Sequence, residues 1–375
     1  MAEYLTNDTD LKKVADAIRT KGKTSAALAY PDEYVSAIKA ITTGIELKIV
    51  VSVPTGSTVI ATKGALTING ISVENSCTLV VPEAGIWDVA ATLNGQTSNT
   101  KSISVVNTYP LTLFYVNSVL DNNEWNTIKA VSDMGQGANY WSIGDCKAVI
   151  LNGMVGHLSF TNYTTYAFII GFNHNASLEG SNRIHFQLAK TALSNGTDIC
   201  FCDSLYGKAV SGTDYFSMNS TQTNSGGWAS SQIRTNICGT SLSDYSGTII
   251  AVIPETLRAV LKPVTKYTDN TGNGGTTASA VTATVDYFFL LSEYEIFGRV
   301  VYSNRNETSK QARYEYYSAG NSMLKYRHDV TTTSVYWLTR TPDHEKTTRF
   351  VISANANPGA ANANYSFGFA PGFCV

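Results

Sequence analysis

Residues 366–374, "SFGFAPGFC", combine three phenylalanines with two glycines and a proline, directly after the small, polar tract "ANANPGAANANY" (354–365). The aromatic run predicts a buried closing strand, with Phe367, Phe369 and Phe373 in the core and a bend near Pro371. The Ala/Asn tract offers little to fill a core and predicts a tolerant surface loop. Such a loop, held by a rigid strand, is a candidate binding surface, and it carries Asn355, Asn357, Asn362 and Asn364.

Composition limits the class of protein. At 375 residues the chain is long enough for more than one domain, and its 29 glycines, 21 tyrosines and 14 phenylalanines favour β-rich, loop-rich modules. A net charge of −2 without a run of Lys or Arg argues against nucleic-acid binding. No apolar run approaches the roughly 20 residues of a membrane-spanning helix, so we expect a soluble chain that is not inserted in membranes. The N-terminus shows no apolar signal core, so an ordinary secretion signal is not expected.

The periodicity of apolar residues changes along the chain. Residues 1–44 show a helical period and predict a small α-helical module, too small to be very stable alone. Residues 45–107 alternate apolar and polar side chains, and Asn94-Gly95 is a strong hairpin signal, so this segment predicts a small β-sandwich. Residues 108–375 mix both periods and predict an α+β domain. Its expected helices lie within 121–135, 226–237, 253–261 and 291–298, and its longest expected loop is 266–282.

One of these helices has a specific start signal. Ser292 is followed three residues later by Glu295, a capping-box spacing, and Gly298 is a suitable stop. Glu295 therefore has a structural explanation, although Asp286, Glu293 and Glu295 also form the densest local group of acids.

Three stretches resemble known families. "LKKVADAIRTKGKTSAALAYPDEYVSAIKAI" (11–41) is similar to a helical module at the start of phage tail and baseplate proteins, and "VPTGSTVIATKG" (53–64) with "CTLVVPEAGIWDVAATLNG" (77–95) resembles bacterial immunoglobulin-like spacers. "DYFFLLSEYEIFG" (286–298), "VYWLTRTP" (335–342) and "SFGFAPGFC" resemble landmarks of C-type-lectin-like domains, including the variable proteins of diversity-generating retroelements. This last resemblance implies an interaction surface between Thr339 and Tyr365.

The composition of the last 65 residues, 311–375, suggests how this surface binds. Tyrosines interleave with charged residues and asparagines, as in natural paratopes, although many of these tyrosines could simply pack against strands. We expect the charged residues to be more exposed than the neighbouring aromatics. The candidate ligand-binding residues are Tyr336, Thr339, Arg340, Asp343, His344, Lys346, Arg349, Asn355, Asn357, Asn362, Asn364 and Tyr365.

Local signatures of catalysis are missing from the sequence. The five histidines show no His-Glu-x-x-His spacing, and neither a Gly-x-Ser-x-Gly elbow nor a Walker loop occurs. The six cysteines are scattered, so buried reduced thiols are expected rather than a metal or disulfide framework. No cofactor is expected. The loop "TDNTGNGG" (268–275) leaves calcium as the alternative, although it lacks the usual ligand spacing.

Together these features predict a non-enzymatic, multidomain receptor-binding protein of a phage tail or tail-like particle, assembled in the host cytoplasm. Residues 1–44 would attach it to other tail or baseplate proteins, and the lectin-like domain would contact a host polysaccharide or protein. A homo-oligomer such as a trimer is expected by analogy with tail fibres. The alternatives are a bacterial or prophage-encoded surface adhesin and a glycan hydrolase of the tail.

Overall fold

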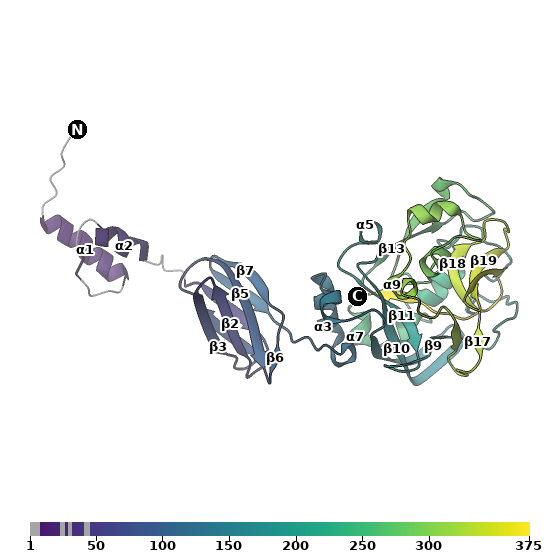
Figure 1. The fold of residues 1–375 in the computed structure, drawn as a ribbon, viewed down its shortest axis with the longest axis horizontal. Helices are drawn as coiled ribbons and strands as arrows, with labels where there is room; N and C mark the ends of the chain where they lie inside the picture. Colours follow the sequence, from purple (N-terminus) through teal and green to yellow (C-terminus); the bar gives the residue numbers. More distant parts are fainter. Residues whose placement is uncertain (1–7, 23–26, 29–31, 41–45) are drawn as a thin grey trace. The chain divides into compact units, whose positions relative to one another are not determined.

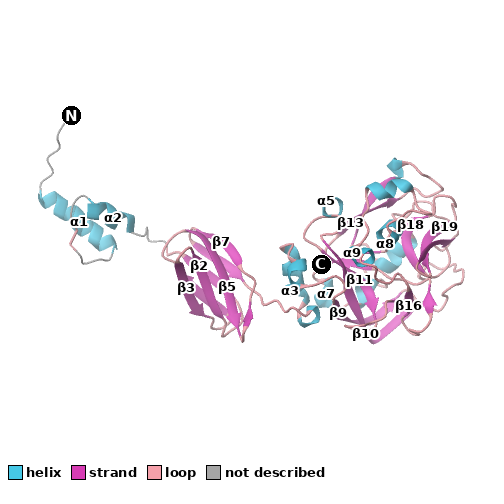
Figure 2. Cartoon of the chain, viewed as in Figure 1, coloured by secondary structure: helices cyan, strands magenta, loops and turns pink. Residues whose placement is uncertain are grey.

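The computed structural model describes residues 8–22, 27–28, 32–40 and 46–375, and the chain divides into two compact units, 1–116 and 117–375 (Figure 1). The expected boundary between residues 44 and 45 lies outside the described residues. Across the described residues the structure is multidomain, with many strands in several sheets and short helices (Figure 2). No helix in this part of the chain is both long and apolar enough to cross a membrane.

The first unit begins with two helices, α1 (Asp8–Gly22) and α2 (Asp32–Ala40). Ala15 and Ile18 of α1 pack with Tyr34 of α2 in a small buried cluster, so the predicted helical module is confirmed for the described residues. The cluster is small, and the apolar side chains of Val14, Val35 and Ile38 remain about half exposed.

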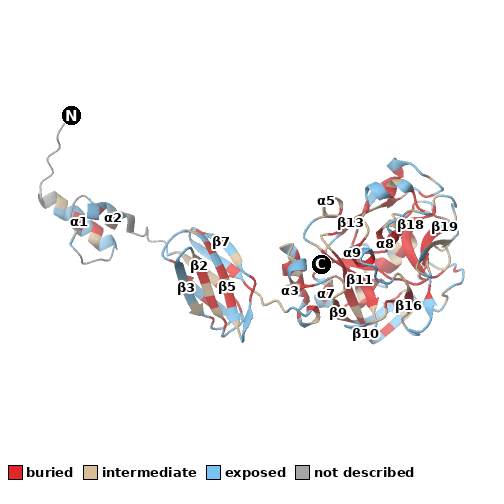
Figure 3. Cartoon of the chain, in the orientation of Figure 1, coloured by how far each residue is buried: buried red, intermediate tan, exposed pale blue. Residues whose placement is uncertain are grey.

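The rest of the first unit is a sandwich of two sheets. One sheet has the order β4 (Ser76–Val80), β1 (Lys48–Ser52), β8 (Thr108–Thr112). The other has the order β3 (Leu66–Ile71), β2 (Thr58–Lys63), β5 (Gly85–Leu93), β6 (Gln96–Thr97), with β7 (Lys101–Val105) also paired to β5. Buried and exposed residues alternate along the strands, as Figure 3 shows. Ile49 and Val51 from one sheet share a core with Trp87 and Val89 from the other.

Two sequence predictions can be checked in the sandwich. Leu93 pairs with Gln96, so Asn94-Gly95 forms the expected two-residue turn, and both turn residues have positive φ. The expected boundary after residue 107 is wrong, because β8 runs parallel to β1 and completes its sheet. Unit 2 begins at Asn117 instead.

The second unit is built on a five-stranded antiparallel sheet. Its strand order is β15 (Phe288–Phe289), β21 (Gly372–Cys374), β11 (Ile184–Lys190), β10 (Leu158–Phe172), β9 (Cys146–Val155). The terminal strand β21 therefore lies inside the sheet. Phe369 and Phe373 are fully buried and Phe367 nearly so, which confirms the predicted closing strand.

Three smaller sheets complete the strands of this unit. They are β12 (Ile199–Cys200), β16 (Lys325–Arg327) and β17 (Ser334–Val335); β13 (Val264–Asp269) and β14 (Val281–Asp286); and β18 (Trp337–Pro342), β19 (Arg349–Ala354) and β20 (Asn357–Asn362). The expected loop 266–282 is shorter than predicted, because its two ends belong to the β13–β14 pair.

Short helices fill the connections of the second unit. The α-helices are α3 (Trp125–Asp133), α4 (Gly137–Tyr140), α5 (Ala176–Glu179), α6 (Ile249–Val252), α7 (Glu255–Arg258), α8 (Glu293–Phe297) and α9 (Glu315–Ser318). The 3₁₀-helices are η1 (Leu120–Asn122), η3 (Ala278–Ala280) and η4 (Arg305–Ser309), and η2 (Ile233–Cys238) is a π-helix. At α8 the capping box between Ser292 and Glu295 is present in both directions, and Gly298 ends the helix in the left-handed conformation.

Candidate binding groove and the buried charge network

The Ala/Asn tract forms a hairpin rather than the expected loop. Residues 357–362 form strand β20, which pairs with β19 from Ala354–Asn357 to Arg349–Asn362. The turn is Asn355-Ala356, with φ of 49° and 62°. Asn tolerates this left-handed conformation, and small side chains are accepted on a half-exposed strand, so composition alone did not separate the two possibilities.

Side chains around this hairpin line a hollow of about 280 Å³, which we call the groove. Four of the predicted binding residues lie in its wall: Tyr336, Arg349, Asn362 and Tyr365. Ala360 and Ala361 of β20 also line it, and their small side chains leave space that larger residues would fill. The remaining lining residues are Ile352 and Phe367.

Three aromatic rings form one wall of the groove. Tyr365 stacks on Phe367 with ring centroids 6.3 Å apart and an interplanar angle of 22°, and Tyr336 lies 6.2 Å from the same Phe367 ring. The backbone N–H of Tyr336 donates to the hydroxyl of Tyr206 at 2.8 Å, and the N–H of Tyr365 donates to the carbonyl of Asn362 at 3.0 Å. These bonds fix the backbone of Tyr336 and Tyr365 before any ligand arrives, which reduces the entropic cost of binding.

Arg349 also lines the groove, and its backbone is held by a buried amide. Arg349 faces Asn362 across the β19–β20 pair. Its backbone carbonyl accepts a hydrogen bond at 2.9 Å from Nδ2 of the fully buried Asn224, which also lies 3.0 Å from the carbonyls of Asp343 and Lys346. One side chain therefore fixes both ends of the 343–349 connection.

Three predicted site residues are buried, contrary to expectation. Thr339 and Arg340 are 0% exposed and Asp343 is 2% exposed, so they do not offer a surface to a ligand in this structure. Arg340 forms a bidentate ion pair with Glu295, with N–O distances of 2.5 and 2.9 Å. The expectation that charged residues here are exposed is wrong for Arg340 and Asp343, because satisfied partners compensate for their burial.

The other predicted residues lie outside the groove lining. Lys346, Asn355 and Asn357 are exposed, and His344 is half-buried with Nδ1 2.6 Å from the carbonyl of Tyr302. Asn364 donates to the carbonyl of Val210, while its Oδ1 is buried without a hydrogen-bond partner. The structure thus brings together four of the twelve predicted residues and separates the rest.

Arg340 on β18 belongs to a buried network of charges. Lys266 on β13 contacts Glu295 at 3.0 Å, Glu179 at 2.6 Å and the Tyr314 hydroxyl at 2.7 Å. Burial raises the pKa of Glu295, but the charges of Arg340 and Lys266 outweigh burial and hold this pKa well below its ordinary value. The network therefore keeps its charges paired inside the core.

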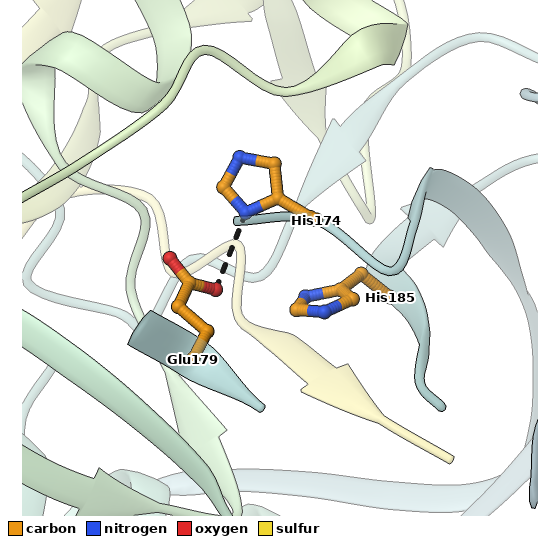
Figure 4. Close-up of side chains that lie close together, drawn as sticks. All are labelled: His174, Glu179 and His185. Atoms are coloured by element: carbon orange, nitrogen blue, oxygen red, sulfur yellow. Dashed lines mark hydrogen bonds and ion pairs between the residues drawn. The ribbon is translucent and has the colours of Figure 1, made fainter. Parts of the chain in front are cut away.

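Two histidines border this network (Figure 4). Nδ1 of His174 lies 3.2 Å from Glu179 and Nε2 lies 3.0 Å from the carbonyl of Ala312, so both ring nitrogens face oxygen atoms. His185 lies beside it with Nδ1 3.1 Å from the Tyr314 hydroxyl, and burial lowers its pKa well below the ordinary value. His185 is therefore neutral, and its Nε2 has no hydrogen-bond partner among the described residues.

The histidine cluster does not fit a metal ion. His174, Glu179 and His185 offer ligand atoms within 4.8 Å of one another. However, the Lys266 ammonium already contacts the same Glu179 carboxylate oxygen that His174 does, so a metal ion there would meet a fixed positive charge. We assign the cluster a structural role.

The acids considered for catalysis have structural partners, and the thiols are buried. Asp286 accepts from Trp228 and pairs with Arg234, and Glu293 accepts from the backbone N–H groups of residues 301–303. All six cysteines are buried and unpaired, as predicted, and burial raises the pKa of Cys200 and Cys238 well above the ordinary value. Thiols of this kind are poor nucleophiles.

Tyr206 and Asn224, which position the groove, were not predicted. They lie more than 100 residues before Tyr336 and Arg349 in the chain, and neither belongs to a local motif. No sequence signal within their own segments indicates these contacts.

Comparison with known proteins gives one partial match. Residues 207–375 match a protein-family model described as "Domain of unknown function (DUF6273)". The matched segment contains the whole groove lining together with Lys266, Glu295 and Arg340. No curated protein and no solved structure matches the chain.

Proposed function

We propose that this chain is a non-enzymatic receptor-binding protein of a phage tail or tail-like particle, and that the groove is where it contacts the host surface. The observation that carries the proposal is the convergence of Tyr336, Arg349, Asn362 and Tyr365 in one hollow. These residues were selected from sequence as a binding surface, and rigid aromatic rings with adaptable polar neighbours suit recognition. The groove contains no paired carboxylates of the kind that glycan hydrolysis needs.

The remaining modules have supporting roles in this proposal. The C-terminal unit is a C-type-lectin-like domain, supported by the buried "WLTRTP" strand β18 and by the terminal strand inside the main sheet. The sandwich is an immunoglobulin-like spacer. The helices attach the chain to other tail or baseplate proteins, supported by the exposed apolar side chains of Val14, Val35 and Ile38. The assembled protein is a homo-oligomer such as a trimer.

Adsorption of fluorescently labelled protein to a panel of bacterial strains tests the proposal. Tyr336→Ala and Tyr365→Ala should each weaken adsorption about tenfold or more, because truncating a central aromatic contact commonly costs at least about 1.4 kcal/mol. Tyr109→Ala is the matched control, since Tyr109 in the sandwich is 36% exposed and Tyr336 is 37% exposed.

Three results would contradict this function. Failure to adsorb to any strain that the particle infects would exclude receptor binding, and equal adsorption of all three tyrosine variants would exclude the groove. Release of reducing ends from cell-wall glycans would favour the hydrolase alternative. Display of the protein on the surface of the producing bacterium, instead of on particles, would favour the adhesin alternative.

A further inference from the structure

The chemistry of the groove narrows the class of ligand, if the proposed function holds. Arg349 is the one charged residue among the groove-lining side chains. It is exposed, and its guanidinium makes no hydrogen bond or ion pair with any residue that the structure describes. The exposed acid nearest to Arg349 in the sequence is Glu345, whose Oε1 lies 3.9 Å from Nε2 of His344. Arg349 is therefore free to pair with an anionic group of a ligand.

The aromatic wall favours a saccharide as the body of that ligand. Tyr336 and Tyr365 present ring surface beside Phe367, and the electron-rich face of an aromatic ring attracts the C–H face of a sugar. The hydroxyls of Tyr336 and Tyr365 make no hydrogen bond within the described part of the chain, so they can meet sugar hydroxyls. A hollow of about 280 Å³ is small for a ligand pocket and suits one or two sugar units.

The edge of the hairpin argues against an extended peptide. Strand β20 is the outer strand of its sheet and could in principle pair with another strand. Pro358 lies within β20 and has no N–H to donate, which weakens any added strand at this edge. A peptide would thus lose main-chain bonds that a saccharide does not need.

We propose that the groove binds an anionic saccharide, with a sugar ring against Tyr365 and Tyr336 and a carboxylate or phosphate on the guanidinium of Arg349. Arg binds either group through two parallel hydrogen bonds, so the two sources share one chemistry. Asn362, opposite Arg349 in the strand pair, supplies an amide to a neighbouring hydroxyl. This inference rests on the proposed function but adds the chemical class of the receptor.

Chemically treated cells of a strain to which the full chain adsorbs can test the ligand class. Periodate oxidation of sugars should abolish adsorption, and protease treatment should not change it. Carbodiimide-driven amidation removes carboxylates and hydrofluoric acid removes phosphodiester-linked polymers, so one of these two treatments should reduce adsorption at least tenfold. The treatment that acts identifies the source of the anionic group.

Matched charge variants test the role of Arg349. Arg349→Gln and Lys346→Gln remove the same charge from the same exposed connection, but Lys346 does not line the groove. We expect Arg349→Gln to weaken adsorption at least tenfold and Lys346→Gln less than twofold. We also expect wild-type adsorption to fall more steeply with salt than that of Arg349→Gln, because exposed charge pairs are screened.

Failure of this inference differs from failure of the proposed function. Adsorption that is sensitive to Tyr365→Ala but unchanged by both amidation and hydrofluoric acid would overturn the anionic ligand and leave receptor binding intact. Loss of adsorption after protease treatment, or equal effects of Arg349→Gln and Lys346→Gln, would also overturn it. Absence of adsorption to every susceptible strain would instead refute the proposed function.

Discussion

Arg340 illustrates how a charged residue is held inside the second unit. Its Nε donates to the Thr268 hydroxyl at 2.7 Å, and its two terminal nitrogens contact Glu295 and two backbone carbonyls. The guanidinium is therefore fully hydrogen-bonded, which is the condition for burying an arginine. Its pKa lies above the ordinary value, because the attraction of Glu295 exceeds the cost of burial.

Removal of this guanidinium should be severe. We expect Arg340→Met to lower the free energy of unfolding by about 3–5 kcal/mol, since Glu295 would stay buried with only Lys266 as a cationic partner. Urea denaturation of the full chain measures the change. The double variant Arg340→Met/Glu295→Leu should be less destabilised than the sum of its single variants, and additive losses would argue against the pairing.

Glu307 makes stability depend on pH in the opposite direction from a paired carboxylate. It is fully buried, and burial raises its pKa from 4.5 to about 8. Between these values the folded protein keeps the proton while the unfolded chain releases it, so stability falls as the pH rises through this window. His185 has the opposite effect on stability, because its lowered pKa disfavours protonation of the folded state. Stability therefore rises with pH on account of His185, but only below the ordinary pKa of 6.5.

The window from pH 6.5 to 8 therefore isolates Glu307. We expect the free energy of unfolding to decrease here with a slope approaching about 1.4 kcal/mol per pH unit, and Glu307→Gln to flatten that slope. Thermal unfolding in buffers across this range measures it. The comparison uses slopes and not absolute stability, since the new amide would also change the contact with Gln311. An unchanged slope in the variant would exclude Glu307 as the titrating group.

The structural role of a residue could be predicted from the sequence where that role depends on residues close to it in the chain. Asn94 and Gly95 specify a turn through their own backbone preferences, and Ser292 with Glu295 specifies a cap within four residues. Arg340 could not be predicted as buried, because its partner lies 45 residues away. The exposed Arg349 and the buried Arg340 have the same side chain, and only the fold distinguishes them.

At the scale of elements, α3 could be predicted from its local sequence, whereas β20 could not. The helix predicted within 121–135 is present as α3, in which Trp125, Ile128 and Val131 are buried. The tract that forms β20 has no alternating apolar residues, and its strand pairing depends on the neighbouring β19. Of the helix predicted within 226–237, residues 226–230 form turns instead, and the π-helix η2 begins only at Ile233. Elements set by tertiary contacts were therefore the ones missed.

The closing segment before β21 depends on a close approach at Gly368. A Cβ at this position would lie 2.2 Å from Sγ of Cys200, and 3.1 and 3.2 Å from the Tyr336 carbonyl and the Cys200 Cβ. Gly368 also exchanges backbone hydrogen bonds with Tyr336 and Leu338, so the segment cannot move away freely. This geometry, and not a left-handed backbone, requires glycine here.

Substitution of this glycine should reveal the contact with Cys200. We expect Gly368→Ala to destabilise the chain by about 2 kcal/mol, as overpacking of a rigid core commonly does. Cys200→Ala removes the closest atom, so the double variant should recover at least half of the loss relative to the additive expectation. Urea denaturation of the four proteins provides the cycle. Purely additive effects would show that the Cys200 sulfur is not the obstacle.

At the scale of the whole molecule, the two units have separate cores. The sandwich core draws on residues 47–115, and the groove and charge network draw only on residues of 117–375. The second unit thus contains every residue that we assign to receptor binding.

Separate production of the two units follows from this division. We expect residues 117–375 alone to fold with a stability within about 1 kcal/mol of the same unit in the full chain, because its core and hydrogen-bond partners are retained. The isolated unit should adsorb to cells and lose adsorption with Tyr365→Ala, whereas residues 1–116 should not adsorb. Circular dichroism and the adsorption assay measure both properties.

Weaker adsorption of the isolated unit, with the ratio between wild type and Tyr365→Ala unchanged, would indicate lost multivalency, because each groove would be intact while fewer grooves bind together. An unfolded or aggregated 117–375 fragment would instead show that the first unit stabilises the second.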